Sequence, residues 1–132
     1  MIDLANIVLA AQKVLNKEKN KNGNITFPIN PFEILNDNGV LIEYSNFEKL
    51  EGLLMYDESK SLVAININRP IKRQRFTAAH ELGHLMLHTN LESNQFIYPI
   101  YGVKSNIEKE ADSFASNLLM TTDELNRQID IY

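Results

Sequence analysis

All three histidines of the chain fall within one short stretch, RFTAAHELGHLMLH at residues 75–88, where a glutamate directly follows the first histidine. Because apolar residues surround them on nearly all sides, we expect a helix over about 73–88. In a helix, His80 and His84 lie one turn apart and are offset by about 40° around the axis. Both imidazoles can therefore reach the same metal ion, with Glu81 beside that ion, where it can hold a water molecule.

This spacing is the H-E-x-x-H pattern, which is typical of zinc metalloproteases with two histidine ligands and a glutamate as general base. The alternative is a core helix that merely carries two histidines. Burying two imidazoles and a carboxylate without partners is costly, and a metal ion gives all three a partner, so the metal site is favoured. His88 continues the same stripe, but its Cα lies about 12 Å along the axis from that of His80, too far to share one ion.

A third ligand must come from elsewhere, and the helix expected over 106–120 offers the carboxylates of Glu108, Glu110 and Asp112. On a helical wheel, Glu108 lies about 60° from the centre of the apolar stripe, whereas the other two lie about 100° away on opposite sides. We therefore expect Glu108 as the third ligand and Glu110 as the alternative. Asp112, one turn later, could accept a hydrogen bond from a ligating histidine. The residues from Ser105 to Glu108 also match a capping box, which would use Glu108 on the backbone instead.

Other patterns indicate the elements that must position these groups. Apolar residues at helical spacing predict a helix over about 1–16, and the polar NKEKNKNGN from Asn16 predicts a loop. A short helical turn is expected after Pro31. Three β-like stretches follow, and the last two suggest a hairpin. They are VLIEY from Val40, GLLMYD from Gly52 and SLVAININ from Ser61.

The C-terminal third is less regular outside its helix. NQFIYPIYG at 94–102 contains a proline and is either a loop or an edge strand, and a short last helix capped by Thr122 is expected. The order of helix, small sheet, helix and helix predicts one α+β domain over 1–132.

Composition narrows the function classes. With 17 acidic and 13 basic residues the net charge is −4, which argues against a dedicated nucleic-acid binder. The chain has no cysteine, so it has neither disulfides nor thiolate metal sites, which suits a reducing compartment. We find no signal peptide and no run long enough to span a membrane, so we expect a cytoplasmic protein.

Two motifs together resemble the ImmA/IrrE family of zinc metallopeptidases. They are RQRFTAAHELGHLMLH at 73–88 and EKEADSFASNLLM at 108–120. The preceding LVAININRPIKRQR is also similar to the strand and connection that lead into the active-site helix of that family. The likeness covers roughly 50–120, and the two motifs are specific as a pair. Thr121 stands where the family often has proline.

The resemblance implies a zincin-like fold, in which a small mixed sheet packs on the active-site helix beside a second zinc-ligand helix. It also implies a gluzincin-like centre, with His80, His84 and Glu108 on one zinc ion per chain and Glu81 as general base. Zinc is favoured over manganese or iron for such nitrogen and oxygen ligands.

Members of the family typically cleave a helix-turn-helix repressor of a phage, mobile element or stress regulon, so the resemblance implies a protein substrate of this kind. This chain is short, and recognition that longer members place in an additional domain is expected to be done differently. The alternative is a non-catalytic zinc module that binds and sequesters such a regulator. The presence of Glu81 favours the enzyme.

Three further questions stay open at the level of sequence. The donor that stabilises the transition state could be His88, Tyr98 or Tyr101. A substrate segment could pair with a sheet edge formed by SLVAININ at 61–68. A basic cluster could guide an acidic partner or simply be solvated. The cluster consists of Arg69, Lys72, Arg73 and Arg75.

Overall fold

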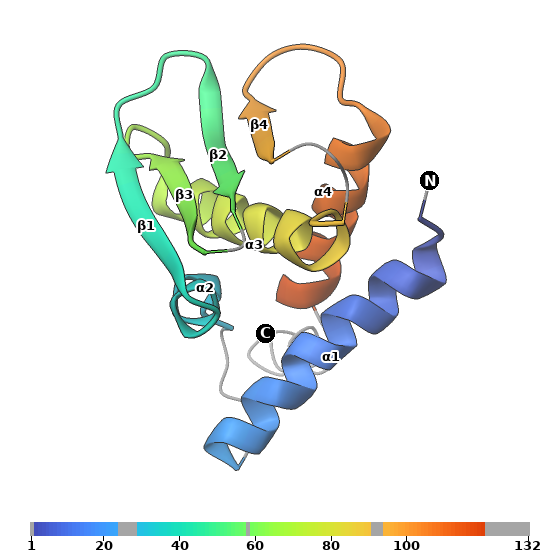
Figure 1. Ribbon diagram of the computed structural model, residues 1–132. Coiled ribbons are helices and arrows are strands. Elements are labelled where there is room, and N and C mark those ends of the chain that lie inside the picture. Colours follow the sequence, from blue (N-terminus) through green and yellow to red (C-terminus); the bar gives the residue numbers. More distant parts are fainter. Residues whose placement is uncertain (1, 24–28, 58, 91–93, 121–132) are drawn as a thin grey trace, which may run out of the picture.

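The computed structural model describes residues 2–23, 29–57, 59–90 and 94–120 (Figure 1). Its helices and strands follow one another in the expected order, so the α+β prediction is confirmed. No helix within these ranges is long and apolar enough to cross a bilayer. The elements are α1 (Leu4–Asn22), α2 (Pro31–Asp37), β1 (Val40–Ser45), β2 (Leu50–Tyr56), β3 (Ser61–Asn66), α3 (Ile71–Leu87), β4 (Gln95–Pro99) and α4 (Asn106–Leu119).

The sheet has four strands in the order β1-β3-β2-β4. β1 runs parallel to β3, while β2 is antiparallel to both β3 and β4, so the predicted hairpin is confirmed. The prediction that the strand from Ser61 forms an edge is wrong, because β3 lies between β1 and β2. Its consecutive Val63, Ala64 and Ile65 are all buried, as expected for a strand with a neighbouring strand on each side. Residues 95–99 form the edge strand β4.

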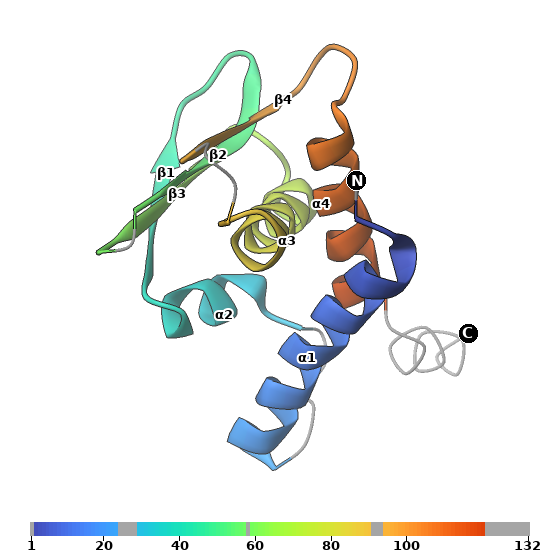
Figure 2. The ribbon, with the colours of Figure 1, turned by 45° about the vertical axis from the view of Figure 1, so that its right-hand side comes forward.

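Three helices stack in layers below the sheet. α3 lies against one face of the sheet, α4 packs on α3, and α1 packs on α4 (Figure 2). Two glycines allow the close approaches that hold α3 in place. A Cβ at Gly52 of β2 would lie 2.7 Å from the Thr77 side chain of α3, and one at Gly83 of α3 would lie 3.1 Å from the Phe114 ring of α4. α3 is thus held between the sheet and α4.

The N-terminal helix is longer than predicted. A loop was expected from Asn16, but α1 continues to Asn22 and ends at Gly23, whose φ of 75° is the left-handed conformation of a helix C-cap. Lysine and glutamate are good helix formers on a solvated surface, so the polar stretch extends the helix instead of ending it. The short helix expected from Thr122 lies outside the described residues.

Candidate metal centre

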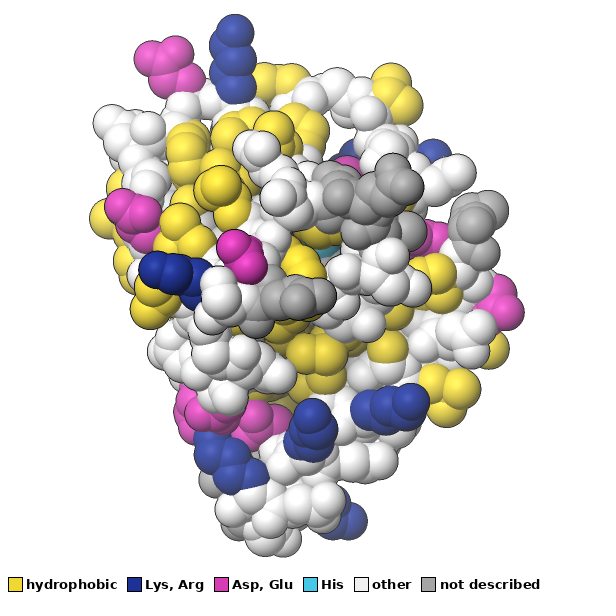
Figure 3. All heavy atoms as spheres, viewed as in Figure 1, with side chains coloured by type: hydrophobic (Ala, Val, Ile, Leu, Met, Phe, Trp, Pro, Cys, Tyr) yellow, Lys and Arg dark blue, Asp and Glu magenta, His cyan; other side chains and the backbone are white. Residues whose placement is uncertain are grey.

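The middle of α3 carries the three residues of the H-E-x-x-H pattern beneath the sheet. His80, Glu81 and His84 are each 0% exposed, and their possible ligand atoms all lie within 4.8 Å of one another. The two imidazole rings are 4.8 Å apart at their centroids and nearly perpendicular, at 82°. On the face seen in Figure 3, almost no histidine surface is visible. The three side chains therefore converge as the spacing predicts, in the interior of the molecule.

Glu108 of α4 completes this group from a second helix. Its Oε2 lies 2.6 Å from Nε2 of His80 and 2.9 Å from Nε2 of His84. The Ser105 hydroxyl accepts the Glu108 backbone N–H at 3.3 Å, as one half of a capping box would. The helix cap and the inward-facing carboxylate thus occur together. The cap uses the backbone N–H of Glu108, while the Glu108 carboxylate faces the two imidazoles.

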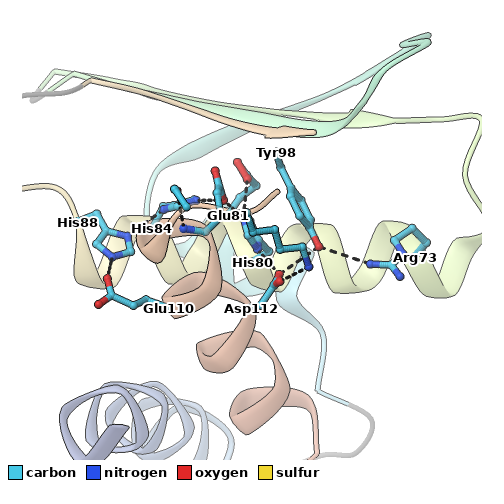
Figure 4. Close-up of polar contacts among 11 residues, drawn as sticks. Arg73, His80, Glu81, His84, His88, Tyr98, Glu110 and Asp112 are labelled. Atoms are coloured by element: carbon cyan, nitrogen blue, oxygen red, sulfur yellow. Dashed lines mark hydrogen bonds and ion pairs between the residues drawn. The ribbon is translucent and has the colours of Figure 1, made fainter. Parts of the chain in front are cut away.

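The second ring nitrogen of each imidazole also has a partner (Figure 4). Nδ1 of His80 lies 2.8 Å from Oδ1 of Asp112, the contact predicted for that residue. Nδ1 of His84 lies 2.9 Å from Nδ1 of His88. Nε2 of His88 in turn lies 2.9 Å from Oε1 of Glu110. Glu110, the alternative third ligand, therefore faces His88 and not the pair of imidazoles that Glu108 contacts.

The edge strand β4 covers the two imidazoles with aromatic rings. The Tyr98 ring stacks on His80, with centroids 3.7 Å apart and planes 4° from parallel. The Phe96 ring stacks on His84 with centroids 4.6 Å apart. Alternate residues of one strand reach the same side of a sheet, so one short strand supplies both rings. Tyr101, by contrast, is 75% exposed and takes no part in these contacts.

Only one of the three suggested transition-state donors therefore lies close to His80. The Tyr98 hydroxyl donates to Oδ1 of Asp112 at 3.1 Å and contacts Arg73 at 3.5 Å. His88 is on the His84 side and is only 2% exposed. Phe96 and the chain of contacts through His88 and Glu110 were not predicted from the sequence. The only available signal was the alternation of large apolar side chains at 96 and 98, which a loop could also carry.

Burial and hydrogen bonding shift the pKa values of this group in opposite directions. Burial lowers the pKa of His80, but hydrogen bonds to Asp112 and Glu108 outweigh it and raise that pKa to about 9. Burial lowers the pKa of His84 below its usual value. Burial raises the pKa of Glu108, but the two imidazoles outweigh it and lower that pKa to about 2. The carboxylate is thus held in its ionised form between two nitrogens, as a cation site requires.

Glu81 is the one member of the group without a hydrogen bond, although its Oε1 lies 3.8 Å from Nε2 of His80. Burial raises its pKa to about 8, and neither of its carboxylate oxygens has a hydrogen-bond partner among the described residues. Buried polar atoms are nearly always paired, so an unpaired carboxylate beside two imidazoles indicates a group that binds there.

The donor set fits a metal ion. Two imidazole nitrogens and one carboxylate oxygen, with a fourth position open, form the usual ligand set of a catalytic zinc site. Ligand atoms of one tetrahedral zinc lie about 3.3 Å apart, given bonds of about 2.0–2.1 Å. The separations of 2.6 and 2.9 Å from Glu108 Oε2 are slightly shorter. A small movement of the Glu108 side chain would therefore admit an ion.

A cleft of about 690 Å³ opens on the outer side of Tyr98 and Asp112. Its basic side chains come from the start of α3, from the residues just before it, and from the segment that precedes α4. They are Arg69, Lys72, Arg73 and Lys104. Three members of the predicted basic cluster thus line the cleft, whereas Arg75 turns away and donates to the Ile29 carbonyl. Arg69 and Arg73 form ion pairs with the buried carboxylate of Glu51, which fixes them at the mouth of the cleft.

Comparison with known proteins decides the family. The family model described as Peptidase_M78, IrrE N-terminal-like domain, matches residues 35–130. The chain belongs to this family. The IrrE N-terminal-like match includes both α3 and α4, and hence every residue of the metal centre, and the zincin-like α+β prediction is confirmed.

A curated relative supports the same assignment. Metallopeptidase ImmA of Bacillus subtilis (strain 168) is 32% identical over 100 residues, which are 76% of this chain and 59% of that protein. The chain thus spans 59% of the length of this relative. The family of metallopeptidases implies a metal at the centre. The single-domain assignment for 1–132 and the individual roles of the site residues stay predictions.

Proposed function

We propose that this chain is a zinc-dependent endopeptidase in which His80, His84 and Glu108 hold the ion and Glu81 is the general base. One observation carries the proposal. A carboxylate from α4 touches both imidazoles of the H-E-x-x-H pattern, while the glutamate between them is left with two unpaired oxygens. A packed structural helix has no use for such an arrangement, and hydrolysis of a peptide bond uses all of it.

Each residue then has a defined task. When bound, zinc supplies the Lewis acidity that polarises the peptide carbonyl and makes a water molecule more acidic. A Glu81 carboxylate oxygen takes the proton of the attacking water and passes it to the departing amine nitrogen. Burial keeps bulk water from that oxygen, so the proton stays available for transfer. Asp112 accepts the Nδ1–H of His80 and thereby leaves Nε2 of that ring free as a ligand.

We further propose that the substrate is a protein, a helix-turn-helix transcriptional repressor of the kind implied by the resemblance. We expect the enzyme and this substrate to be cytoplasmic. Lys72 lines the cleft and supports an acidic segment as the part that binds. The other basic side chains there already have acidic partners, Glu51 and Asp112. Tyr98 lies between this cleft and His80. A segment that enters here therefore has to displace the Tyr98 ring before it reaches the centre.

A non-catalytic module that sequesters the regulator is the second candidate. The observation in its favour is the complete burial of His80, Glu81 and His84. Such a module would need the ligands but not Glu81, whose unpaired carboxylate in the interior is costly to keep. The enzyme therefore accounts for more of the site.

Glu81→Gln tests the proposal. The zinc-loaded variant and the wild type are incubated with the helix-turn-helix regulator encoded nearest to this chain, and fragments are followed by mass spectrometry. We expect the variant to cleave about 10²–10⁴-fold more slowly, because general base catalysis contributes that much, while still binding one zinc per chain. Glu43→Gln, the same change at an exposed residue of β1, should cleave normally. Cleavage by Glu81→Gln at the normal rate would disprove the mechanism, and a stable uncut complex with the wild type would favour the binding module.

A further inference from the structure

A chain of buried polar contacts leads away from His84 through His88 to Glu110 (Figure 4). His84 Nδ1 contacts His88 Nδ1 at 2.9 Å, and His88 Nε2 contacts Glu110 Oε1 at 2.9 Å. The other oxygen of Glu110 accepts the backbone N–H of Ile2 at 2.5 Å. Side chains from α3 and α4, and the backbone that precedes α1, therefore form one continuous path that ends on a predicted metal ligand.

When Nε2 of His84 binds a metal, the chemistry of these groups allows a single arrangement of protons. If His84 offers Nε2 to a metal, its proton is on Nδ1 and donates to His88. His88 Nδ1 must then be the acceptor, so the His88 proton is on Nε2 and donates to Glu110. A carboxylate has no proton to offer in return, and it also accepts the N–H of Ile2. Every donor along this path thus meets an acceptor.

We propose that His88 and Glu110 position His84 for metal binding by fixing its tautomer. Both are positioning residues, and neither touches the ion or a substrate. The inference rests on the proposed function, because it takes Nε2 of His84 as a ligand. Without Glu110, His88 can place its proton on Nδ1, opposite the Nδ1–H of His84. That conflict favours a His84 proton on Nε2, where it blocks the metal.

The surroundings of the path support a specific role. His88 is 2% exposed and Glu110 is 7% exposed, so water does not compete for their hydrogen bonds. The Phe96 ring covers both His84 and His88, with centroids 4.6 and 6.1 Å away. His88 is also the C-cap of α3, and its backbone N–H still bonds the His84 carbonyl at 2.9 Å. The C-terminal end of α3 therefore holds the His88 ring beside the His84 ring.

The test combines zinc affinity with direct detection of the ring protons. Variants His88→Leu and Glu110→Ala, and the double variant, are titrated with zinc in competition with a chelator. We expect His88→Leu to weaken zinc binding about 10–100-fold, as is usual when the partner of a ligand histidine is lost. Glu110→Ala should also weaken it, and Glu43→Ala, an exposed control, should not. Because Glu110 acts through His88, the double variant should match His88→Leu to within about twofold. If the two residues acted independently, their losses would add.

Long-range proton–nitrogen spectra of the zinc-loaded wild type provide the second readout, which does not depend on a variant that folds. We expect the His84 proton on Nδ1 and the His88 proton on Nε2, and loss of the fixed His88 tautomer in Glu110→Ala. A His88 proton on Nδ1 in the wild type, or additive losses in the double variant, would overturn the inference. So would unchanged zinc affinity in folded His88→Leu. Failure of the wild type to bind zinc would instead reject the proposed function itself.

Discussion

The two histidines of the H-E-x-x-H pattern lie in contrasting surroundings. His80 contacts Asp112, whose carboxylate also meets Lys104 and the Tyr98 hydroxyl at the edge of the basic cleft. His84 contacts His88 in the interior, beneath the ring of Phe96. We refer to Asp112, Tyr98 and Lys104 as the outer branch. The inner branch consists of His88, Glu110 and Phe96.

Except for Tyr98, which is only 2% exposed, the polar members of the two branches differ in exposure. The side chains of Lys104 and Asp112 are 42% and 20% exposed, whereas those of His88 and Glu110 are 2% and 8% exposed. Charges near solvent are screened and can rearrange, while a buried hydrogen-bonded network is rigid and costly to break. One ligand is therefore held by groups that a substrate can reach, and the other by groups that belong to the core. Changes in the inner branch should lower stability as well as metal affinity, and changes in the outer branch should lower metal affinity while the fold persists.

The largest effect expected is on stability, from Phe96→Ala in the inner branch. Phe96 is 5% exposed and stacks on His84, so truncation leaves a cavity at the junction of β4 and α3. We expect the free energy of unfolding to fall by about 3–5 kcal/mol, as for other buried phenylalanines. Urea denaturation followed by circular dichroism measures this.

Ile97→Ala is the matched control for that change. It lies on the same strand, but its side chain is 46% exposed and points away from α3. We expect a loss of about 1 kcal/mol or less, as for most surface positions. If both variants lower the free energy of unfolding equally, Phe96 does not stabilise the core more than an exposed residue of the same strand. The inner branch would then not be the more rigid of the two.

Asp112→Asn should have the next largest effect, on zinc affinity instead of stability. The amide keeps the shape of the side chain but loses the charge that favours the Nδ1–H of His80. We expect zinc affinity to fall about 10–100-fold, or about 1.4–2.8 kcal/mol. The unfolding free energy measured with chelator present should change by less than about 1 kcal/mol, since Asp112 is partly exposed and its ion pair with Lys104 is screened. A loss of stability with zinc affinity intact would reverse the roles assigned to the branches.

The sequence was informative about the contacts that lie within one helix. The helical period of α3 predicts where His80, Glu81 and His84 lie, and the apolar stripe of α4 predicts which carboxylate turns inward. The same wheel gave Glu110 and Asp112 equal offsets of about 100°, yet both contact buried imidazoles. A wheel describes one helix and has no information on what packs beside it.

The contacts that the sequence did not predict come from elements distant along the chain. Glu110 is held by the backbone of Ile2, which is 108 positions away. Phe96 and Tyr98 reach the centre only because β4 pairs with β2, and a stretch that contains Pro99 could equally have formed a loop. The edge position expected for residues 61–68 was wrong for the same reason, since local periodicity does not specify which strand lies at an edge.

The smallest effect expected is from Tyr98→Phe, and it bears on what the outer branch does in catalysis. Burial raises the pKa of Tyr98 above its usual value, so the hydroxyl keeps its proton and donates to Asp112. The variant keeps the ring that stacks on His80 and removes this hydrogen bond, a loss of about 1 kcal/mol, together with the 3.5 Å contact from Arg73. We therefore expect zinc affinity and the rate of cleavage each to fall by no more than about fivefold.

Steady-state kinetics on the zinc-loaded variant separate this positioning role from a catalytic one. If the hydroxyl acts only through Asp112, kcat and zinc affinity fall together and by similar factors. If the hydroxyl stabilises the transition state directly, kcat falls by about 10²-fold or more while zinc affinity and KM hold. That second result would make Tyr98 a catalytic residue, and it would mean that the ring turns from Asp112 toward the substrate during the reaction. The outer branch would then be the mobile half of the centre, and the inner branch the fixed half.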